Sequence, residues 1–353
     1  MNCHRPADIL SGRDQSALAK FFRAGLSVLG PGYRAGLAIR NAAFDTGLRR
    51  SRRLPRPVIS VGNITTGGTG KTPMVIELVR RMVRWGHRPA VLLRGYRAGA
   101  AGSDEAILLG QALGAAVPVY AHPNRYTAAL AITERHPEVD VLVLDDGFQH
   151  RQVQRDLDLV LIDATEPFGF DRLLPRGLLR EPPECLRRAG AVIVTKADGV
   201  GTEQRSKIDQ RIATASGKAP VAHTVHRWLA WLDGQDREHG LNHLAGKTVL
   251  GVCGIGNPTS FEATLRDVTG TDTPAMAFKD HYPYTPDDLE EILAEAGRRR
   301  ATAVVTTAKD WVKWKSLLSS SPAVPIYRPL MQIEFLDGAD AVEQLLASVM
   351  SKR

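Results

Sequence analysis

From residue 58 onward, short apolar runs alternate with stretches in which apolar residues recur at helical spacing, as over 72–85. Near-continuous apolar runs are typical of strands that are buried on both faces of a sheet. Alternation of such strands with helices predicts an α/β fold, in which a mostly parallel sheet is flanked by helices. The clearest runs lie at 58–62, 139–146, 157–164 and 191–198.

The pattern changes at 226–246, which is polar, punctuated by glycine and carries tryptophan. A second, smaller alternation of apolar runs and helical stretches follows this segment. We therefore expect four parts along the chain: an N-terminal helical segment (1–57), a first α/β domain (58–225), a linker (226–246) and a smaller C-terminal α/β domain (247–353).

The segment 15–47 places apolar residues at helical spacing between arginines, with Gly-Pro-Gly at 30–32. This pattern predicts two short amphipathic helices. They could lie in a membrane interface, or they could pack on the protein's own core with a solvated basic face. A span is not expected, because no run of about 18 apolar residues occurs.

The net charge of +8 is concentrated in the same part of the chain. Residues 1–60 contain eleven Lys or Arg and three Asp, so this segment alone carries the whole excess. Such a localised excess predicts contact with an anionic surface, here a membrane rather than nucleic acid. The three cysteines, Cys3, Cys185 and Cys253, are scattered, which favours a reduced intracellular protein without structural disulfides or a zinc site.

The stretch "VISVGNITTGGTGKTP" (58–73) has the order of a phosphate-binding loop: strand, glycine-rich turn, then Lys-Thr at a helix start. The standard phosphate-loop motif has glycine at the position of Thr65. Residues 66–72 are instead similar to the variant form of this motif, which contains two adjacent glycines. Lys71 would reach the β- and γ-phosphates, and Thr72 would hold Mg²⁺. The candidate cofactor-binding residues are Thr65, Thr66, Gly67, Gly68, Thr69, Gly70, Lys71 and Thr72.

Asp145 and Asp146 end the apolar run in "VLVLDDGFQH". Adjacent acids at the end of a buried strand cost desolvation unless a cation meets them. We expect one to bind Mg²⁺ and the other to act as its partner or to handle a proton. "TKAD" (195–198) resembles the base-reading motif of GTP-binding proteins, so a nucleotide-switch GTPase or ATPase acting on a protein partner is the alternative function.

Arginines gather near the expected carboxyl-end face of the sheet, where guanidinium groups suit phosphate. Together with the basic N-terminus they suggest an anionic lipid substrate. Transfer to an alcohol also needs a group that takes the hydroxyl proton. Asp104 is a candidate for this base and His281 for its partner. The arginines are Arg94, Arg97, Arg125, Arg172, Arg176 and Arg180.

Five stretches occur in an order that closely resembles the tetraacyldisaccharide 4′-kinase (lipid A 4′-kinase) family, over about residues 30–335: "ISVGNITTGGTGKTP", "LRGY", "LDDGFQHR", "DRLLPRGLLREP" and "DHYPYT". The resemblance implies ATP-dependent phosphorylation of the 4′-hydroxyl of a tetraacyl disaccharide 1-phosphate in lipopolysaccharide biosynthesis. It also implies a peripheral enzyme at the cytoplasmic face of a bacterial inner membrane, with two α/β/α domains joined by a short β linker.

The resemblance carries roles onto matching positions. It makes Lys71 and Asp146 part of the catalytic group, with Asp104 as catalytic aspartate and His281 as its partner across a domain cleft. Two departures occur: the segment between "RGY" and Asp104 is short, so that any lid there is absent or reduced, and Ala106 replaces the usual proline. The candidate substrate-binding residues are Arg94, Tyr96 in the family's mobile "RGY" element, Arg125, Gln149 and His150.

Overall fold

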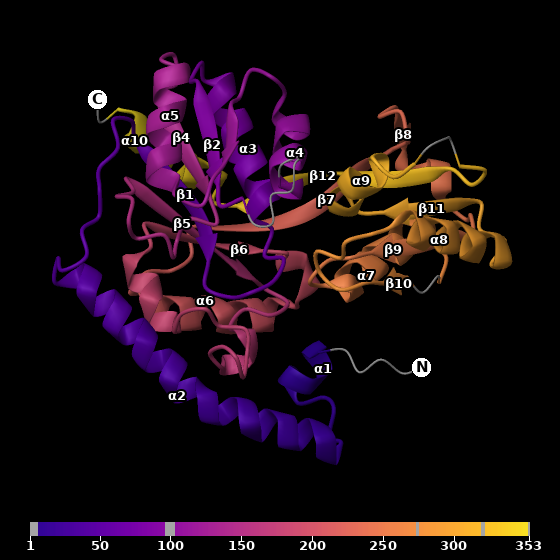
Figure 1. Cartoon of the computed structure of the whole chain (residues 1–353), viewed down its shortest axis with the longest axis horizontal. Helices are drawn as coiled ribbons and strands as arrows, with labels where there is room; N and C mark the ends of the chain where they lie inside the picture. The colour runs from indigo at the N-terminus through magenta and orange to yellow at the C-terminus, as the bar shows by residue number, and fades with distance from the viewer. Residues whose placement is uncertain (1–5, 96–102, 273–274, 319–321, 352–353) are drawn as a thin grey trace. The chain divides into compact units, whose positions relative to one another are not determined.

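The computed structural model describes residues 6–95, 103–272, 275–318 and 322–351. Packing of the backbone divides the chain into two compact units (Figure 1). The first comprises Met1–Arg94, Val117–Val225 and Phe335–Arg353, and the second comprises Gly95–Ala116 and His226–Glu334. The division falls inside two strands, β7 (Ala222–Leu232) and β12 (Ile326–Asp337).

The first unit is built on six parallel strands in the order β6-β5-β1-β4-β2-β3. All residues of β1, β2, β4, β5 and β6 are buried, which explains their near-continuous apolar runs. The expected α/β fold with a mostly parallel sheet is therefore confirmed. The strands are β1 (Val58–Asn63), β2 (Pro89–Leu93), β3 (Val119–Ala121), β4 (Val141–Asp145), β5 (Leu157–Asp163) and β6 (Ala191–Thr195).

Helices cover this sheet (Figure 1). Helix α5 (Arg125–Arg135) packs on β2 and β4 in a fully apolar cluster, and α6 (Thr202–Ser216) packs on β5 and β6 in another. The P-loop helix is α3 (Lys71–Arg84), and an ion pair between Arg81 and Glu343 joins it to α10 (Ala339–Met350). The C-terminal helix therefore belongs to the first unit, although the predicted boundaries assigned it to the C-terminal domain.

The N-terminal segment forms a short helix, α1 (Pro6–Ser11), and one 29-residue helix, α2 (Ala17–Asp45). The prediction of two helices broken at Gly-Pro-Gly is wrong, because α2 continues through Pro31. Proline removes one backbone donor, and contacts beyond it hold the helix in place: Tyr33 and Arg40 both bond to backbone carbonyls of the first unit. Within the described residues, no helix is both long and apolar enough to cross a membrane.

The second unit contains the strand order β10-β9-β11-β12-β7, with β8 (Glu238–Gly240) pairing antiparallel to β7. Strands β9 (Val249–Cys253), β10 (Met276–Ala277) and β11 (Ala303–Thr306) are parallel. The helices are α4 (Asp104–Leu113), α7 (Pro258–Thr269), α8 (Pro286–Arg298) and α9 (Ala308–Lys315). Helix α4 packs on α9, so this unit includes a segment that the predicted boundaries placed in the first α/β domain.

Candidate functional site

The loop between β1 and α3 has the backbone of a phosphate cradle. Gly67 (φ 116°) and Gly70 (φ 84°) lie in the left-handed region, which glycine reaches without steric cost. Gly70 is also the N-cap of α3, and no side chain caps this helix end. The first N–H groups of α3 and its dipole are therefore available to an anion, so the loop fits the triphosphate of a nucleotide.

The first half of this loop pairs with residues 178–180, in the segment that carries Arg172, Arg176 and Arg180. The backbone N–H of Thr66 donates to the Leu178 carbonyl (2.7 Å), and Thr65 forms an isolated bridge with Leu179. Arg180 donates its backbone N–H to the Ile64 carbonyl at 2.7 Å. The stretch "LLPRGLLREP" thus lies directly beside the phosphate loop.

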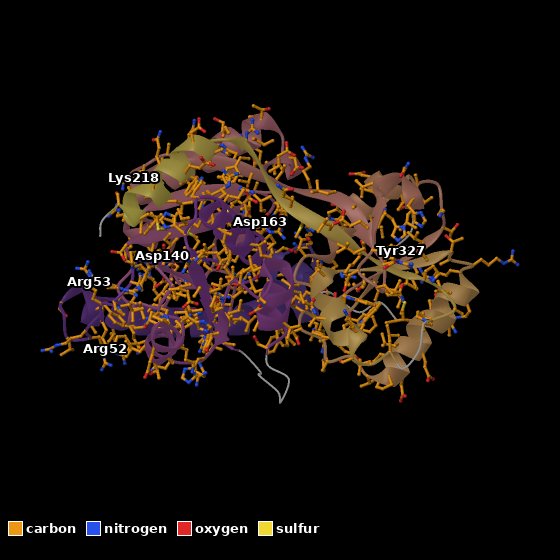
Figure 2. All side chains as sticks on the ribbon, turned by 90° about the horizontal axis from the view of Figure 1, so that it is seen from above. Arg52, Arg53, Asp140, Asp163, Lys218 and Tyr327 are labelled. Carbon is orange, nitrogen blue, oxygen red and sulfur yellow. The ribbon has the colours of Figure 1, made fainter. Side chains whose placement is uncertain are left out.

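The second half of the loop rests on the "TKAD" residues. Thr195 donates its hydroxyl to the Thr69 carbonyl (3.0 Å), and the Lys196 ammonium donates to the Gly68 carbonyl (2.9 Å). Lys196 also pairs with Asp163, which lies inside the first unit at the end of β5 (Figure 2). This lysine therefore supports the phosphate loop from the neighbouring strand.

The two acids at the end of β4 have different surroundings. Asp145 is 4% exposed and accepts from the Thr72 hydroxyl at 3.2 Å. Asp146 has a left-handed backbone (φ 53°) and lies between Lys71, at 3.5 Å, and Arg180, at 2.8 Å. The change of backbone conformation turns the second acid toward the cations.

Burial alone would raise the pKa of Asp146. The positive charges of Lys71 and Arg180, together with the hydrogen bonds from Arg180, outweigh burial and lower this pKa to about 2. Asp146 is therefore ionised at neutral pH. Two carboxylates and the Thr72 hydroxyl fit Mg²⁺, which prefers a few oxygen ligands completed by water and substrate phosphate.

Arg125 is 2% exposed and donates to the backbone carbonyls of Asp145 (2.8 Å) and Asp146 (3.1 Å). It thus fixes the turn that carries the acids. Gln149 donates to the carbonyl of Asn63 at 2.8 Å, and Asn63 is the last residue of β1, just before the phosphate loop. Burial, with the charges of Arg125 and other arginines, lowers the pKa of His150 to about 4, so that this histidine is neutral at pH 7.

Sequence reasoning listed Arg180 only as one of several arginines and missed Glu181. Glu181 is fully buried and accepts from Arg188 at 2.7 Å. Arg40 of α2 lies 3.7 Å from the same carboxylate, and Tyr33 of α2 donates to the Arg180 carbonyl (3.0 Å). The N-terminal helix is therefore bonded to the segment that holds Asp146. The signal in the sequence that could have identified Arg180 and Glu181 is the "REP" that ends the stretch "LLPRGLLREP".

The remaining candidates lie elsewhere. Asp104 begins α4 behind the N-cap Ser103, and it belongs to the second unit together with His281. Among the described residues no direct hydrogen bond joins these two side chains; each contacts a lysine of α9 instead. Arg94 follows β2 in the first unit, and its charge contributes to the lowered pKa of His150. Tyr96 lies outside the described residues.

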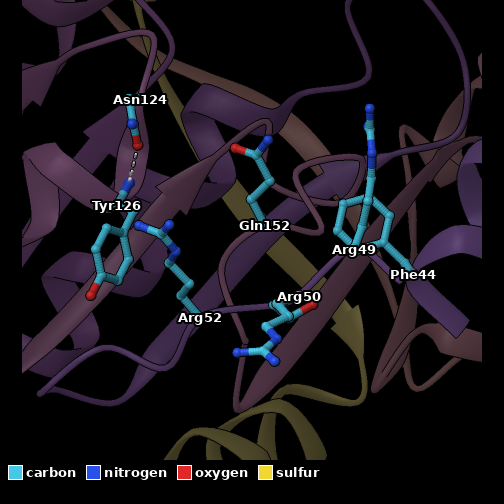
Figure 3. A pocket seen from close by; sticks show the side chains of 8 residues that line it. Phe44, Arg49, Arg50, Arg52, Asn124, Tyr126 and Gln152 are labelled. Atoms are coloured by element: carbon cyan, nitrogen blue, oxygen red, sulfur yellow. Dashed lines mark hydrogen bonds between the residues drawn. The ribbon is translucent and has the colours of Figure 1, made fainter. Parts of the chain in front are cut away.

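A pocket of about 670 Å³ lies where α2 ends in the first unit, at Arg52 (Figures 2 and 3). The Arg52 guanidinium stacks over the Tyr126 ring, 5.0 Å from its centroid. Of the described residues, three arginines and no acidic residue line the pocket. The pocket is therefore strongly basic. Its lining comprises Phe44, Arg49, Arg50, Ser51, Arg52, Asn124, Tyr126 and Gln152.

Comparisons with known proteins agree with these features. The model of the tetraacyldisaccharide-1-P 4′-kinase family matches residues 22–350. The tetraacyldisaccharide 4′-kinase of Anaeromyxobacter dehalogenans is 38% identical over 89% of this chain and 87% of its own length. That of Syntrophus aciditrophicus is 40% identical over 82% of this chain and 83% of its own length.

Among solved structures, LpxK from Aquifex aeolicus in complex with ATP matches 93% of this chain and 99% of its own, with a TM-score of 0.70 and 26% identity. The family and the named relatives confirm the predicted kinase function, and the GTPase alternative has no better support.

Proposed function

The chain belongs to the tetraacyldisaccharide-1-P 4′-kinase family, and from this premise we propose how its own residues carry out ATP-dependent phosphorylation of the 4′-hydroxyl. The reaction forms a bond between the 4′-oxygen and the γ-phosphorus and breaks the bond from that phosphorus to the β,γ-bridging oxygen, so that ADP leaves. The hydroxyl proton passes to a base on the protein. ATP supplies the phosphoryl group, and Mg²⁺ neutralises its charge when bound.

The phosphate loop and the acids of β4 form the proposed nucleotide site. Lys71 and the N–H groups at the start of α3 bind and orient the phosphates. Thr72 and Asp145, within 3.2 Å of each other, would hold Mg²⁺. Asp146 stays ionised between Lys71 and Arg180, and it fixes the position of the Lys71 ammonium. This arrangement of Lys71, Thr72 and the two acids is the observation that carries the proposal.

We assign the proton transfer to Asp104, with His281 as its partner in the second unit. Arg94, Gln149 and His150 are proposed to contact the acceptor, together with Tyr96. Arg125, which the sequence also predicted as a substrate contact, is buried and holds the turn of the acids instead. Gln149 and His150 come three and four residues after Asp146, and Gln149 bonds to the Asn63 carbonyl, so that a group able to bond to hydroxyls lies next to the phosphate loop. A neutral His150 can donate or accept a hydrogen bond without adding charge.

The proposed membrane contact is made by α2 and the basic pocket, at the cytoplasmic face of the inner membrane. Leu18, Phe21 and Val28 are 72–78% exposed. At about 100° per residue, the exposed apolar side chains of α2 share a stripe roughly 120° wide, which suits an interfacial helix. The pocket arginines Arg49 and Arg52 would attract anionic headgroups, and cosedimentation with phosphatidylglycerol but not phosphatidylcholine vesicles tests this contact.

The activity test is transfer of label from γ-labelled ATP to the tetraacyl disaccharide 1-phosphate in detergent micelles. Lys71→Met should lower kcat by about 10²–10³, because a positioned charge at the transferred group is lost. Lys218→Met, at an exposed site, is the matched control and should change nothing. EDTA should abolish transfer, and excess Mg²⁺ should restore it. Nucleotide hydrolysis without any labelling of the acceptor would refute the proposal.

A further inference from the structure

Helix α9 is rigidly fixed within the second unit. Its N-cap Thr307 and the fully buried Asp310 bond to each other, and Asp310 also accepts from the Gly254 N–H at 2.8 Å, just beyond β9. Trp314 is completely buried in the core of the unit. The side chains that extend from this short helix therefore have well-defined positions.

Two lysines of α9 contact the two residues proposed for proton transfer. Lys309 and Lys313 are four residues apart, which places them on the same side of the helix. The Lys309 ammonium lies 3.0 Å from Nε2 of His281 and 3.0 Å from the Asp280 carboxylate. The Lys313 ammonium lies 3.6 Å from Oδ2 of Asp104.

These contacts are more constrained than ordinary surface ion pairs. The side chain of Lys313 is 10% exposed; it also donates to the Tyr282 carbonyl at 3.0 Å and lies over the Tyr284 ring. His281 has a left-handed backbone (φ 60°), which is uncommon for a residue other than glycine, and the surrounding contacts must hold it there. The loop and α9 together fix the imidazole.

We infer that Lys309 and Lys313 are positioning residues for the phosphoryl transfer, acting through His281 and Asp104 respectively; this inference rests on the proposed roles of those two residues. An ammonium group has only donors, so Nε2 of His281 must accept from Lys309, and the ring proton then sits on Nδ1. Lys313 binds Oδ2 of Asp104, which assigns Oδ1 to the proton of the substrate hydroxyl.

The first test replaces Lys313 by methionine, which keeps the apolar stem and removes the charge. Misplacement of Asp104 should lower kcat about 10- to 100-fold while the KM for ATP stays unchanged. Lys313→Arg should restore part of the activity. Lys315→Met is the control, because Lys315 lies on the same helix but is 48% exposed and pairs with Asp236. Thermal unfolding of each variant by circular dichroism checks that the fold is intact.

A double-mutant cycle shows whether Lys313 works through Asp104. In an Asp104→Asn background, Lys313→Met should lower kcat no further. If the two losses in kcat are fully additive, the inference about Lys313 is wrong, while the role of Asp104 as base stands. The same holds if Lys313→Met keeps the parent kcat and Asp104→Asn is impaired. If Asp104→Asn keeps the full kcat, the assignment of the base falls and takes the inference with it.

Lys309 is tested without reference to turnover. The ¹⁵N shifts of the His281 imidazole, assigned by comparison with His281→Gln, report which ring nitrogen carries the proton. We expect the Nδ1–H form in the unchanged protein and a mixture of both forms in Lys309→Met. A dominant Nε2–H form in the unchanged protein would refute the contact as the origin of the tautomer.

Discussion

Gly62, in β1, is a position where one added methyl group should disturb the site. A Cβ atom there would lie 2.5 Å from Cβ of Phe148 and 2.8 Å from its backbone nitrogen. Both distances are shorter than real Cβ contacts, and one of the opposing atoms is backbone. Phe148 cannot easily retreat, because its side chain is fully buried and the Arg188 guanidinium lies 4.7 Å from its ring centroid.

The magnitude of the Gly62→Ala effect follows from this geometry. Over-packing of a close-packed core costs about 1–3 kcal/mol in the free energy of unfolding. Phe148 comes two residues after Asp146, so the shift that relieves the contact passes into the turn of the acids. A displacement of about 1 Å in a catalytic frame costs on the order of 10²-fold in rate. We therefore expect a less stable protein with a strongly reduced kcat.

Urea unfolding followed by circular dichroism gives the stability of Gly62→Ala, and acceptor labelling gives its kcat. The control is Gly297→Ala in α8, where no heavy atom lies within 4 Å of the new Cβ. The control should be neutral or stabilised by up to about 1 kcal/mol, because alanine favours helix over glycine. If Gly62→Ala unfolds within about 0.5 kcal/mol of the parent and keeps its kcat, the rigid coupling of β1 to the acid turn is refuted.

Three further substitutions test the charged groups around the loop. The pKa of His150 is about 4 in the fold, below its ordinary 6.5, so the parent should lose stability as pH falls from 6.5 to 4, by less than the roughly 3 kcal/mol of a fully buried group because solvent screens part of the effect. His150→Gln should not show this loss; urea titrations at several pH values measure it. Arg180→Lys removes the guanidinium whose Nη1 donates to both carboxylate oxygens of Asp146, so kcat should fall about 10-fold or more, since lysine is a compact point charge without the planar guanidinium. Lys196→Met leaves the carboxylate of Asp163 buried without its cation, and urea unfolding should show a loss of about 3–5 kcal/mol.

The parallel sheet and the phosphate loop could be predicted from the sequence because their signals are local. A strand buried on both faces needs an unbroken apolar run, and a tight phosphate turn needs glycine where φ is positive, as at Gly67 and Gly70. The acids of β4 follow from the same logic, since the carboxyl end of a buried strand leaves few other places for them. Which acid faces Thr72 depends on the positive φ of Asp146, which no residue pattern announces.

The grouping of distant segments could not be predicted, because it depends on long-range packing. Helix α4 packs on α9, about 200 residues later in the sequence, and α10 returns to the first unit through contacts such as that of Glu343 with Arg81. The lysines of α9 were missed for the same reason, since "AKDWVK" contains no motif that points to Asp104 or His281. The continuity of α2 was not predicted, because the destabilisation of a helix by Pro31 can be read from the local sequence. The tertiary contacts that offset it cannot.

The bonds of α2 change how its contribution to activity has to be measured. Arg40 approaches the buried carboxylate of Glu181, and Tyr33 binds the carbonyl of Arg180, whose guanidinium holds Asp146. Removing α2 would therefore take away both the proposed membrane contact and a support of the nucleotide site. The exposed apolar side chains of Leu18 and Phe21 lie far along the chain from these contacts and make none of them. Substitutions at the apolar stripe separate membrane binding from site geometry, which a truncation of the helix does not.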